Sequence, residues 1–248
     1  MDPYGDEKLV ELYDADNAPG SDHAYFRAVA DSLGAVKIID LGCGTGLLTR
    51  ALAVDGRSVV GIDPSPTMLN YARRTPSPVT WIDGDSSVIE PSGDVDLVVC
   101  SGNTLMHIPS LPSTFAAIAG ALRTGGVLVF ESRNPAARAW ESWTREATYG
   151  DRDTAVGHLT EWLDLIEAGD DGRVVFDAHN LYDDGRDDVY RTELYFRSVA
   201  EITAALDAAG FMVQVMAGWK NEPFEPESRL MVFRAEKAGL CEGRRPAL

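Results

Sequence analysis

The stretch that decides the fold lies at residues 36–46 and reads VKIIDLGCGTG. Its first six residues form a short apolar run rich in β-branched side chains, which is typical of a buried strand. Glycines follow at once, and residues 47–54 then fit a helix. Glycine allows a tight turn and lets a ligand approach the backbone where a Cβ would collide. Residues 36–54 therefore predict a strand, a ligand-binding turn and a helix.

Strands and helices continue to alternate through the first half of the chain. Ser65 and Pro66 start one of the helices, with serine as the N-cap and proline at the first helical position. Gly125 and Gly126 are expected to end another. The expected strands are residues 58–62, 79–82, 95–100 and 127–131, and the expected helices are residues 66 to about 74 and about 111 to 122. This order predicts an α/β fold with a mostly parallel, seven-stranded sheet, helices on both faces, and ligands beyond the carboxyl ends of the strands.

The last third of the chain has a different pattern. Residues 159–166, 174–182 and 189–197 read as strands joined by acidic, glycine-containing turns, which indicates an antiparallel lid inserted after the fifth strand. Ser198 and Glu201 form a capping box that opens a helix ending at Gly210. We expect one structural domain with these parts: a helical arm or lid at 1–34, a cofactor-binding core at 35–133, an acceptor-binding insert at 134–197, a C-terminal helix with antiparallel strands (212–216 and 230–234) at 198–237, and a loose tail at 238–248.

Length and composition exclude several classes of protein. With 248 residues the chain can bury one substantial core, and 45% hydrophobic with 25% charged residues is ordinary for a globular protein. The formal net charge of −17 opposes binding to nucleic acid or to an anionic membrane. No apolar run approaches the roughly 18 residues of a membrane span, and the first residues lack the basic and apolar parts of a secretory signal. We therefore expect a cytoplasmic monomer or homodimer that binds neither nucleic acid nor membrane.

The three cysteines, Cys43, Cys100 and Cys241, have no paired spacing. They indicate neither a disulfide framework nor a zinc site, and Cys43 and Cys100 are expected to be packing thiols at strand ends. Because no histidine–carboxylate cluster has the spacing of metal ligands either, no metal is predicted.

An acid after the second predicted strand narrows the kind of ligand. The glycine spacing after Asp40 is Gly-x-Gly-x-Gly, whereas dinucleotide-binding loops have Gly-x-Gly-x-x-Gly. Asp63 follows Gly42 by 21 residues, where a carboxylate can accept both ribose hydroxyl protons of a nucleoside. The alternative is a simple turn residue at a strand end. Together with the glycine loop, Asp63 favours a nucleoside ligand.

These residues, within the stretch 36–131, resemble the class I S-adenosylmethionine-dependent methyltransferases of the small-molecule type. The resemblance implies a Rossmann-like fold, S-adenosyl-L-methionine as cofactor, and methylation of oxygen, nitrogen or carbon in a small-molecule acceptor, as in secondary metabolism. Asp40 would help to hold the methionine ammonium and Asp63 would bind the ribose, with Tyr13 and Tyr25 as candidate lids. The other cofactor-binding positions that it implies are Gly42, Cys43, Gly44, Gly46, Pro64, Met68, Gly84, Asp85, Ser86, Ser101, Gly102 and Asn103.

Candidate catalytic residues follow the fourth and fifth predicted strands. Methyl transfer from a sulfonium needs alignment and exclusion of water, and positioning alone contributes about 7–11 kcal/mol. His107 is the candidate general base, and such a base raises the reaction rate about 10²–10⁴-fold where the acceptor must lose a proton. The alternative is a surface or cofactor-facing histidine that transfers no proton. Arg133 is the candidate anchor for an acceptor carboxylate or phosphate, and its alternative is an ion pair with Glu131 or Glu141.

The insert supplies further aromatic side chains and histidines. Trp140, Trp143 and Trp162 fit either an aromatic acceptor pocket or the core of a lid. His158 and His179 lie in or beside the predicted meander, where they either take part in catalysis or are packed or solvated.

Other functions compete with methyl transfer. A nicotinamide-dependent oxidoreductase shares the nucleotide-binding logic, but the glycine spacing disfavours it. A non-catalytic S-adenosylmethionine-binding protein would keep the loop and the acids without turnover. A macromolecular acceptor is disfavoured by the net charge and by a lid-like insert, which suits a closed pocket.

Overall fold

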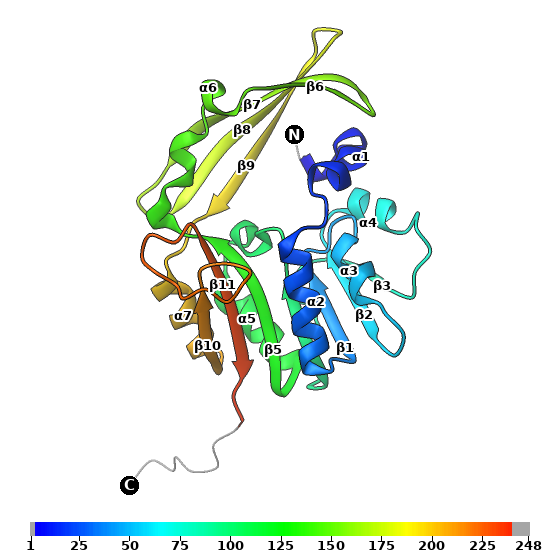
Figure 1. The fold of residues 1–248 in the computed structure, drawn as a ribbon, viewed down its shortest axis with the longest axis vertical. Coiled ribbons are helices and arrows are strands. Elements are labelled where there is room, and N and C mark those ends of the chain that lie inside the picture. The colour runs from blue at the N-terminus through cyan, green and yellow to red at the C-terminus, as the bar shows by residue number, and fades with distance from the viewer. Residues whose placement is uncertain (1–2, 240–248) are drawn as a thin grey trace.

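The computed structural model describes residues 3–239, which form two β-sheets with helices packed around them (Figure 1). The larger, sheet A, has seven strands in the order β10-β11-β5-β4-β1-β2-β3. Its first five strands in sequence pair in parallel, and β11 and β10 complete the sheet in antiparallel pairing. The strands are β1 Lys37–Leu41, β2 Ser58–Asp63, β3 Thr80–Asp83, β4 Val95–Cys100, β5 Leu122–Arg133, β10 Phe211–Met216 and β11 Leu230–Lys237. The predicted seven-stranded, mostly parallel sheet is confirmed.

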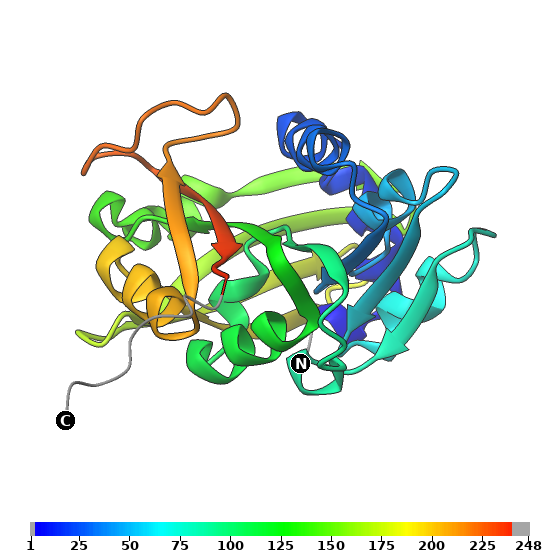
Figure 2. The ribbon, with the colours of Figure 1, turned by 90° about the horizontal axis from the view of Figure 1, so that it is seen from below.

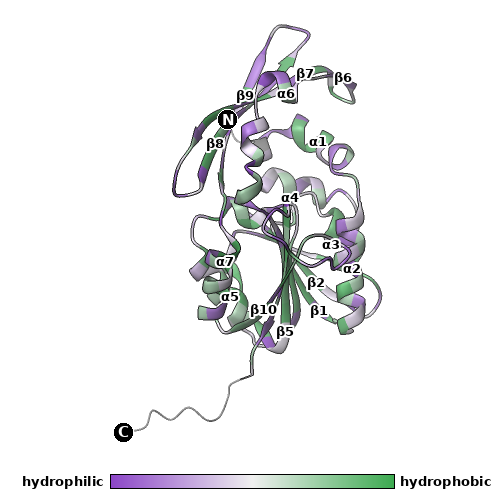
Figure 3. Cartoon of the chain, turned by 60° about the vertical axis from the view of Figure 1, so that its left-hand side comes forward, coloured by the Kyte–Doolittle hydropathy of each residue, from purple (hydrophilic) through white to green (hydrophobic). Residues whose placement is uncertain are grey.

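Helices cover both faces of sheet A, as Figure 2 shows from below. On one face, α2 (Ser21–Leu33) and α3 (Leu47–Leu52) bury Phe26 and Leu48 against the strands. On the other face, α5 (Leu111–Ala121) and α7 (Val199–Ala208) enclose an apolar cluster that includes Phe115. The interior strands are accordingly the most hydrophobic part of the chain in Figure 3. None of the helices within residues 3–239 is both long enough and apolar enough to cross a membrane.

The insert forms sheet B, a separate four-stranded antiparallel sheet in the order β6-β7-β8-β9. It stands above the carboxyl ends of the parallel strands in Figure 1. Its strands are β6 Gly150–Thr154, β7 Gly157–Ala168, β8 Arg173–Tyr182 and β9 Asp187–Tyr195. Short helical segments lead into it, namely η4 Pro135–Ala137, η5 Ala139–Ser142 and α6 Arg145–Thr148. The predicted antiparallel lid after the fifth strand is therefore confirmed.

The N-terminal arm lies between sheet B and the core (Figure 1). It consists of η1 (Pro3–Gly5) and α1 (Glu7–Asp16), and α1 packs beside α4 (Pro66–Ala72). Asp6 is the N-cap of α1, and it also accepts a 2.7 Å hydrogen bond from the Tyr190 hydroxyl of β9. Arg152 of β6 forms an ion pair with Asp16 at the other end of α1. The arm is thus tied to the insert at both ends of one helix.

One local expectation was wrong, and one strand was missed. The helix predicted to end at Gly125-Gly126 ends at Ala121, and β5 begins at Leu122 and runs through both glycines. The pairing of β5 with β4 shifts register there, and a Cβ on Gly126 would lie 2.9 Å from the Val95 carbonyl oxygen, so the glycine serves a bulge. β6 was not predicted, because GDRDT lacks the alternating apolar pattern of a strand. The expected loose tail at 238–248 falls mostly on residues 240–248, outside the described residues.

Candidate functional site

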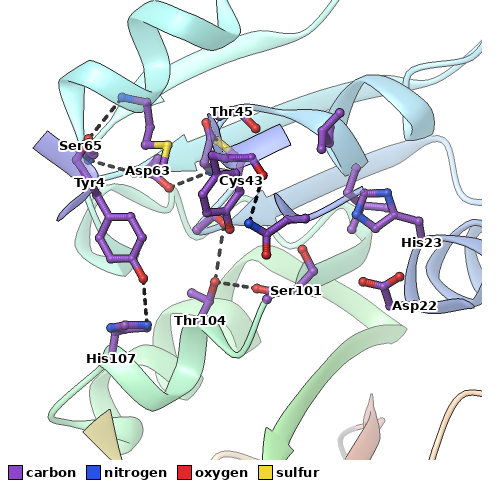
Figure 4. A pocket seen from close by; sticks show the side chains of 18 of the residues that line it. Tyr4, Asp22, His23, Cys43, Thr45, Asp63, Ser65, Ser101, Thr104 and His107 are labelled. Atoms are coloured by element: carbon purple, nitrogen blue, oxygen red, sulfur yellow. Dashed lines mark hydrogen bonds between the residues drawn. The ribbon is translucent and has the colours of Figure 1, made fainter. Parts of the chain in front are cut away.

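A cavity of about 550 Å³ opens at the carboxyl ends of β1, β2 and β4, beneath the N-terminal arm (Figure 4). Its volume lies in the range of small-molecule sites, and its place is the switch point of a parallel sheet, where β1 lies between β2 and β4. We call it the main cavity. Its lining residues are Tyr4, Tyr13, Asn17, Ala18, Asp22, His23, Gly42, Cys43, Gly44, Thr45, Leu47, Leu48, Asp63, Pro64, Ser65, Met68, Ser101, Gly102, Thr104 and His107.

The glycine loop after β1 forms the floor of the main cavity. Gly42, Gly44 and Gly46 have φ of +76°, +53° and +80°, in the left-handed region that favours glycine. A Cβ on Gly42 would lie 2.3 Å from Thr104, and one on Gly46 would lie 2.3 Å from Trp81. A Cβ on Gly44 would meet only the Tyr13 ring, at 4.0 Å. Gly42 and Gly46 therefore serve packing, and Gly44 leaves room that opens onto the cavity.

Asp63 joins the loop after β1 to the turn after β2. The side chain is 8% exposed, and its two oxygens accept 2.8 Å hydrogen bonds from the backbone N–H groups of Gly44 and Ser65. Asp63 also lines the main cavity. Ser65 in turn is the N-cap of α4, accepting from the Met68 N–H as predicted.

Two buried acids lie behind the wall of the main cavity. Asp40 is fully buried, and burial raises its pKa to about 7 although Thr49 donates a 2.6 Å hydrogen bond to it. Glu131 is 4% exposed, and burial raises its pKa to about 7 as well, although the Asn103 N–H donates a 2.6 Å hydrogen bond to it. In each carboxyl group the second oxygen has no hydrogen-bond partner within residues 3–239. These groups add negative potential behind the cavity whenever they are ionised.

The charge of the main cavity selects the kind of ligand. Asp22 and Asp63 line it, whereas neither lysine nor arginine is among the lining residues that the structure describes. A dinucleotide brings a pyrophosphate, which such a wall repels, while a ligand with a positive charge is attracted. Burial raises the pKa of the Cys43 thiol far above its ordinary value, so this residue is a packing thiol and not a nucleophile. Cys100 is fully buried and has the same shift.

Tyrosines of the N-terminal arm cover the main cavity. Tyr13 reaches in from α1, and burial together with the nearby charge of Asp63 raises its pKa. The Tyr4 ring meets the His107 ring edge to face, with 3.4 Å between the hydroxyl and Nε2 (Figure 4). Tyr4 is held in place because Ser65 donates a hydrogen bond to its carbonyl oxygen. Tyr25, the other candidate lid, is instead buried against Trp219, so that expectation was wrong.

His107 lies in η3 (Thr104–His107), just beyond β4, and faces the main cavity. Burial, with a smaller contribution from the charge of Arg133, holds its pKa below the ordinary value, so the ring is neutral at pH 7. Arg133 ends β5 close by, half-buried, with its guanidinium carbon 5.5 Å from the centre of the Trp143 ring. It does not line the main cavity.

The expected ion-pair alternative for Arg133 is wrong. Glu141 pairs with Arg138 at 2.8 Å, and Glu131 accepts its hydrogen bond from Asn103. No carboxylate in the described part of the chain forms an ion pair with Arg133, which is half-buried.

The structure brings most of the predicted cofactor positions together, but not all of them. Those that line the main cavity are Tyr13, Gly42, Cys43, Gly44, Asp63, Pro64, Met68, Ser101 and Gly102. Those that lie outside its wall are Asp40, Gly46, Gly84, Asp85, Ser86 and Asn103. Asp85 is exposed and accepts a hydrogen bond from the Ser87 N–H, which caps its own turn.

Several cavity residues were not predicted. Tyr4, Asp22, His23 and Thr104 lie in segments without a local motif, and only the packing of the arm and of η3 brings them to the cavity. The Nδ1 atom of His23 is buried and has no hydrogen-bond partner within the described residues.

The tryptophans and histidines of the insert lie away from the main cavity. Trp140 and Trp143 pack on Phe196 in an apolar cluster, as expected for the core of a lid. Trp162 stacks on His179 at 4.5 Å, and neither lines the cavity. His158 pairs with Asp151 and Asp153, also outside it. Within residues 3–239, no three His, Cys, Asp or Glu side chains are placed to hold a metal ion together.

Comparisons with known proteins agree with this geometry. Residues 38–126 match the model of a methyltransferase domain. The glycine N-methyltransferase of Oryctolagus cuniculus is 32% identical over 123 residues, covering 41% of this chain and 42% of the relative. The ubiquinone biosynthesis O-methyltransferase of Proteus mirabilis is 32% identical over 122 residues, covering 47% and 49%. The match thus spans less than half of either curated relative.

A solved structure extends the likeness to nearly the whole fold. The CcbJ methyltransferase from Streptomyces caelestis superposes with a TM-score of 0.78 over 96% of this chain and 99% of that one. Its sequence identity is 21%, so the superposition establishes the shared fold alone.

Proposed function

We propose that this chain, whose residues 38–126 match the model of a methyltransferase domain, moves a methyl group from S-adenosylmethionine to a small organic acceptor. One observation carries the proposal: the cavity floored by the glycine loop of that domain is lined by two acids, Asp22 and Asp63, and by neither lysine nor arginine among the described residues. S-adenosylmethionine has a cationic sulfonium and no phosphate. Such a ligand fits the charge of this wall.

The residues present fit the cofactor from end to end. Asp63 lies in the cavity wall and would bind the ribose hydroxyls, and Pro64 and Met68 would offer apolar contacts to adenine. At the other end, Asp22 and His23 lie together (Figure 4), and the unpartnered Nδ1 of His23 suits the amino-acid part of the ligand. Asp40, behind the loop, would act on the ammonium as a buried charge and not by contact with the cavity. The remaining positions outside the wall, Gly46, Gly84, Asp85, Ser86 and Asn103, would shape the loops that surround the ligand.

When bound, S-adenosylmethionine supplies a methyl group already activated by a sulfonium leaving group. The chain must therefore align the acceptor and exclude water. Positioning of the reactants can lower the activation free energy by about 7–11 kcal/mol. Tyr4 and Tyr13 of the arm cover the main cavity from the insert side. They also line a smaller cavity of about 200 Å³, which reaches β7 and β8 of the insert through Leu159 and Asn180. We place the donor in the core, residues 35–133, and the acceptor at its junction with the insert, residues 134–197.

His107 is the general base of the proposed reaction. Its neutral ring can take the proton that an acceptor hydroxyl loses as the new bond to the methyl group forms, or the proton that an acceptor ammonium must lose before its nitrogen attacks; S-adenosylhomocysteine is the leaving group. This chemistry favours methylation of oxygen or nitrogen over carbon, since those acceptors carry a removable proton. A role in secondary metabolism stays a prediction.

Arg133 is the proposed anchor for an anionic group of the acceptor. A half-buried guanidinium without a carboxylate partner among the described residues attracts a carboxylate or phosphate, and its flat face already lies over Trp143. The acceptor class that fits is therefore a small hydroxy or amino compound that carries an acidic group.

The competing functions make different binding predictions. A nicotinamide-dependent oxidoreductase would have to place a pyrophosphate against Asp22 and Asp63, which the charge of the wall opposes. A non-catalytic binding protein would need the same donor contacts but no base, and the neutral His107 at the cavity favours catalysis.

Two measurements test the proposal. Calorimetry with S-adenosylmethionine, its demethylated product S-adenosylhomocysteine and NAD⁺ is expected to give heat for the first two alone. Labelled methyl transfer is then measured on hydroxy and amino compounds with and without a carboxylate. No heat with either sulfur nucleoside, or binding of NAD⁺ in their place, would overturn the donor assignment.

A further inference from the structure

Arg197 forms an unusual set of hydrogen bonds beside the main cavity. It follows β9 and precedes Ser198, the N-cap of α7, so it stands where the insert returns to the core. Its guanidinium donates to three backbone carbonyls, those of Leu105 at 3.3 Å, Ile108 at 2.7 Å and Pro109 at 2.9 Å. These carbonyls flank His107 on both sides. We call residues 104–109 the His107 segment.

Every hydrogen bond of the Arg197 guanidinium within the described residues goes to a backbone carbonyl, and the guanidinium carbon also lies 5.0 Å from the centre of the Tyr195 ring. Arg197 is half-buried, burial lowers its pKa, and no carboxylate of residues 3–239 forms an ion pair with it. A buried cation normally costs free energy unless it is hydrogen-bonded, so its three carbonyl partners account for its presence here. The planar fork of arginine can reach several carbonyls at once, which a lysine ammonium on a flexible stem cannot do with the same geometry.

Side chains of the same segment divide between the core and the insert. Leu105 is buried in the cluster around α5 and sheet A. Met106 is 1% exposed and packs with Trp143, Phe196 and other apolar residues of the insert. His107, between Met106 and the Arg197-bound carbonyls, is left facing the main cavity. The segment is therefore a joint between the two parts of the chain, and Arg197 closes that joint.

We propose that Arg197 is a positioning residue that fixes the His107 segment, so that the insert sets the direction in which His107 faces the acceptor. The role of His107 rests on the proposed function, whereas the mechanical coupling does not. Arg197 touches neither cavity. Its effect on the reaction would pass through the ring of His107 and its Tyr4 contact alone.

Histidine NMR tests the coupling without an identified acceptor. The chain has four histidines, so the Cε1–H signal of His107 is assigned by its loss in His107→Asn. In Arg197→Ala, the pKa of His107 is expected to rise toward its ordinary value, because water reaches the loosened ring. Amide hydrogen exchange within the His107 segment is expected to quicken, while S-adenosylhomocysteine affinity stays at the wild-type value.

Control variants separate positioning from charge and from general damage. Arg133→Met removes a charge that lowers the His107 pKa, so it is expected to raise that pKa without faster exchange in the segment. Arg123→Ala removes a guanidinium bound to Asp96 and to the Thr124 carbonyl, remote from η3, and is expected to change neither readout. Arg197→Lys keeps the charge but not the fork, and an intermediate change in both readouts is expected.

The outcomes decide the matter separately for the two proposals. The coupling would be overturned if Arg197→Ala kept the wild-type His107 pKa and the wild-type amide exchange in the His107 segment. If the alanine variant does not fold, wild-type values of both readouts in Arg197→Lys would overturn it. Once an acceptor is found, turnover in Arg197→Ala is expected to fall roughly 10- to 100-fold with KM for the donor unchanged. If the wild type binds no sulfur nucleoside while the His107 readouts still move, the proposed function fails and the coupling stands.

Discussion

A single added carbon at Gly44 gives the sharpest test of the donor site, because Gly34 provides a matched control. Gly44 has φ of +53°, and Gly34, at the end of α2, has φ of +57°. A Cβ at Gly34 would have no heavy atom within 4 Å, and one at Gly44 would meet Tyr13 at 4.0 Å. Gly44→Ala and Gly34→Ala therefore carry the same backbone strain, about 1–2 kcal/mol, without a clash. At about 2–4 °C per kcal/mol for a chain of this size, both are expected to melt roughly 2–8 °C below the wild type.

Ligand affinity should distinguish Gly44→Ala from Gly34→Ala, although their stabilities are expected to be equal. Of the two glycines only Gly44 lines the main cavity, and its new methyl would stand between the loop and Tyr13, in the cavity where the donor is proposed to bind. Forcing one methyl into a packed contact costs about 1–3 kcal/mol, which weakens Kd roughly 5- to 150-fold. Calorimetric titration with S-adenosylhomocysteine measures this loss directly. Equal affinity in the two variants would refute the placement of the ligand over Gly44.

Three further predictions test other groups of the site. Asp63→Asn should weaken the binding of S-adenosylhomocysteine at least tenfold, since an amide N–H donor replaces one carboxylate oxygen. An unchanged calorimetric Kd would contradict the ribose assignment. His107→Asn should lower turnover about 10²–10⁴-fold at constant donor affinity, and wild-type turnover would leave a reaction driven by positioning alone. Burial raises the Glu131 pKa from 4.5 to about 7, so the folded protein favours the protonated carboxyl group. The stability that this group contributes is fully present below pH 4.5 and is lost as the pH rises through 7. Glu131→Gln should therefore flatten the fall in melting temperature over that window, and an unaltered pH profile would contradict the assignment.

The sequence predicts the local structure around the glycine loop well because its signals are local. A strand, a glycine turn and a helix fill residues 36–54, and the turn lies in the structure where the pattern places it. Ser65 caps α4 and Ser198 forms its capping box with Glu201 as expected, since a cap involves residues three apart in the chain. Where three or four neighbouring residues determine a conformation, their identities suffice to predict it.

The rest of the site depends on contacts between distant segments. Asp22 and His23 reach the main cavity because α2 packs on sheet A, and nothing near them in sequence marks a ligand site. The sequence also could not predict that Arg133 forms no ion pair with Glu141. Glu141 pairs instead with Arg138, three residues before it at the start of η5. Arg197 carries no motif, and its three carbonyl partners lie about 90 residues away.

This division explains why likeness to other proteins informs one half of the reaction more than the other. The matched methyltransferase domain ends at residue 126, before Arg133 and before the whole insert. The His107 segment lies inside the matched stretch, yet Met106 and the carbonyls beside His107 are held by the insert. The curated relatives are named for different reactions, glycine N-methylation in one case and an O-methylation of ubiquinone biosynthesis in the other. We therefore propose to seek the acceptor through residues 134–197 and the joint that Arg197 closes.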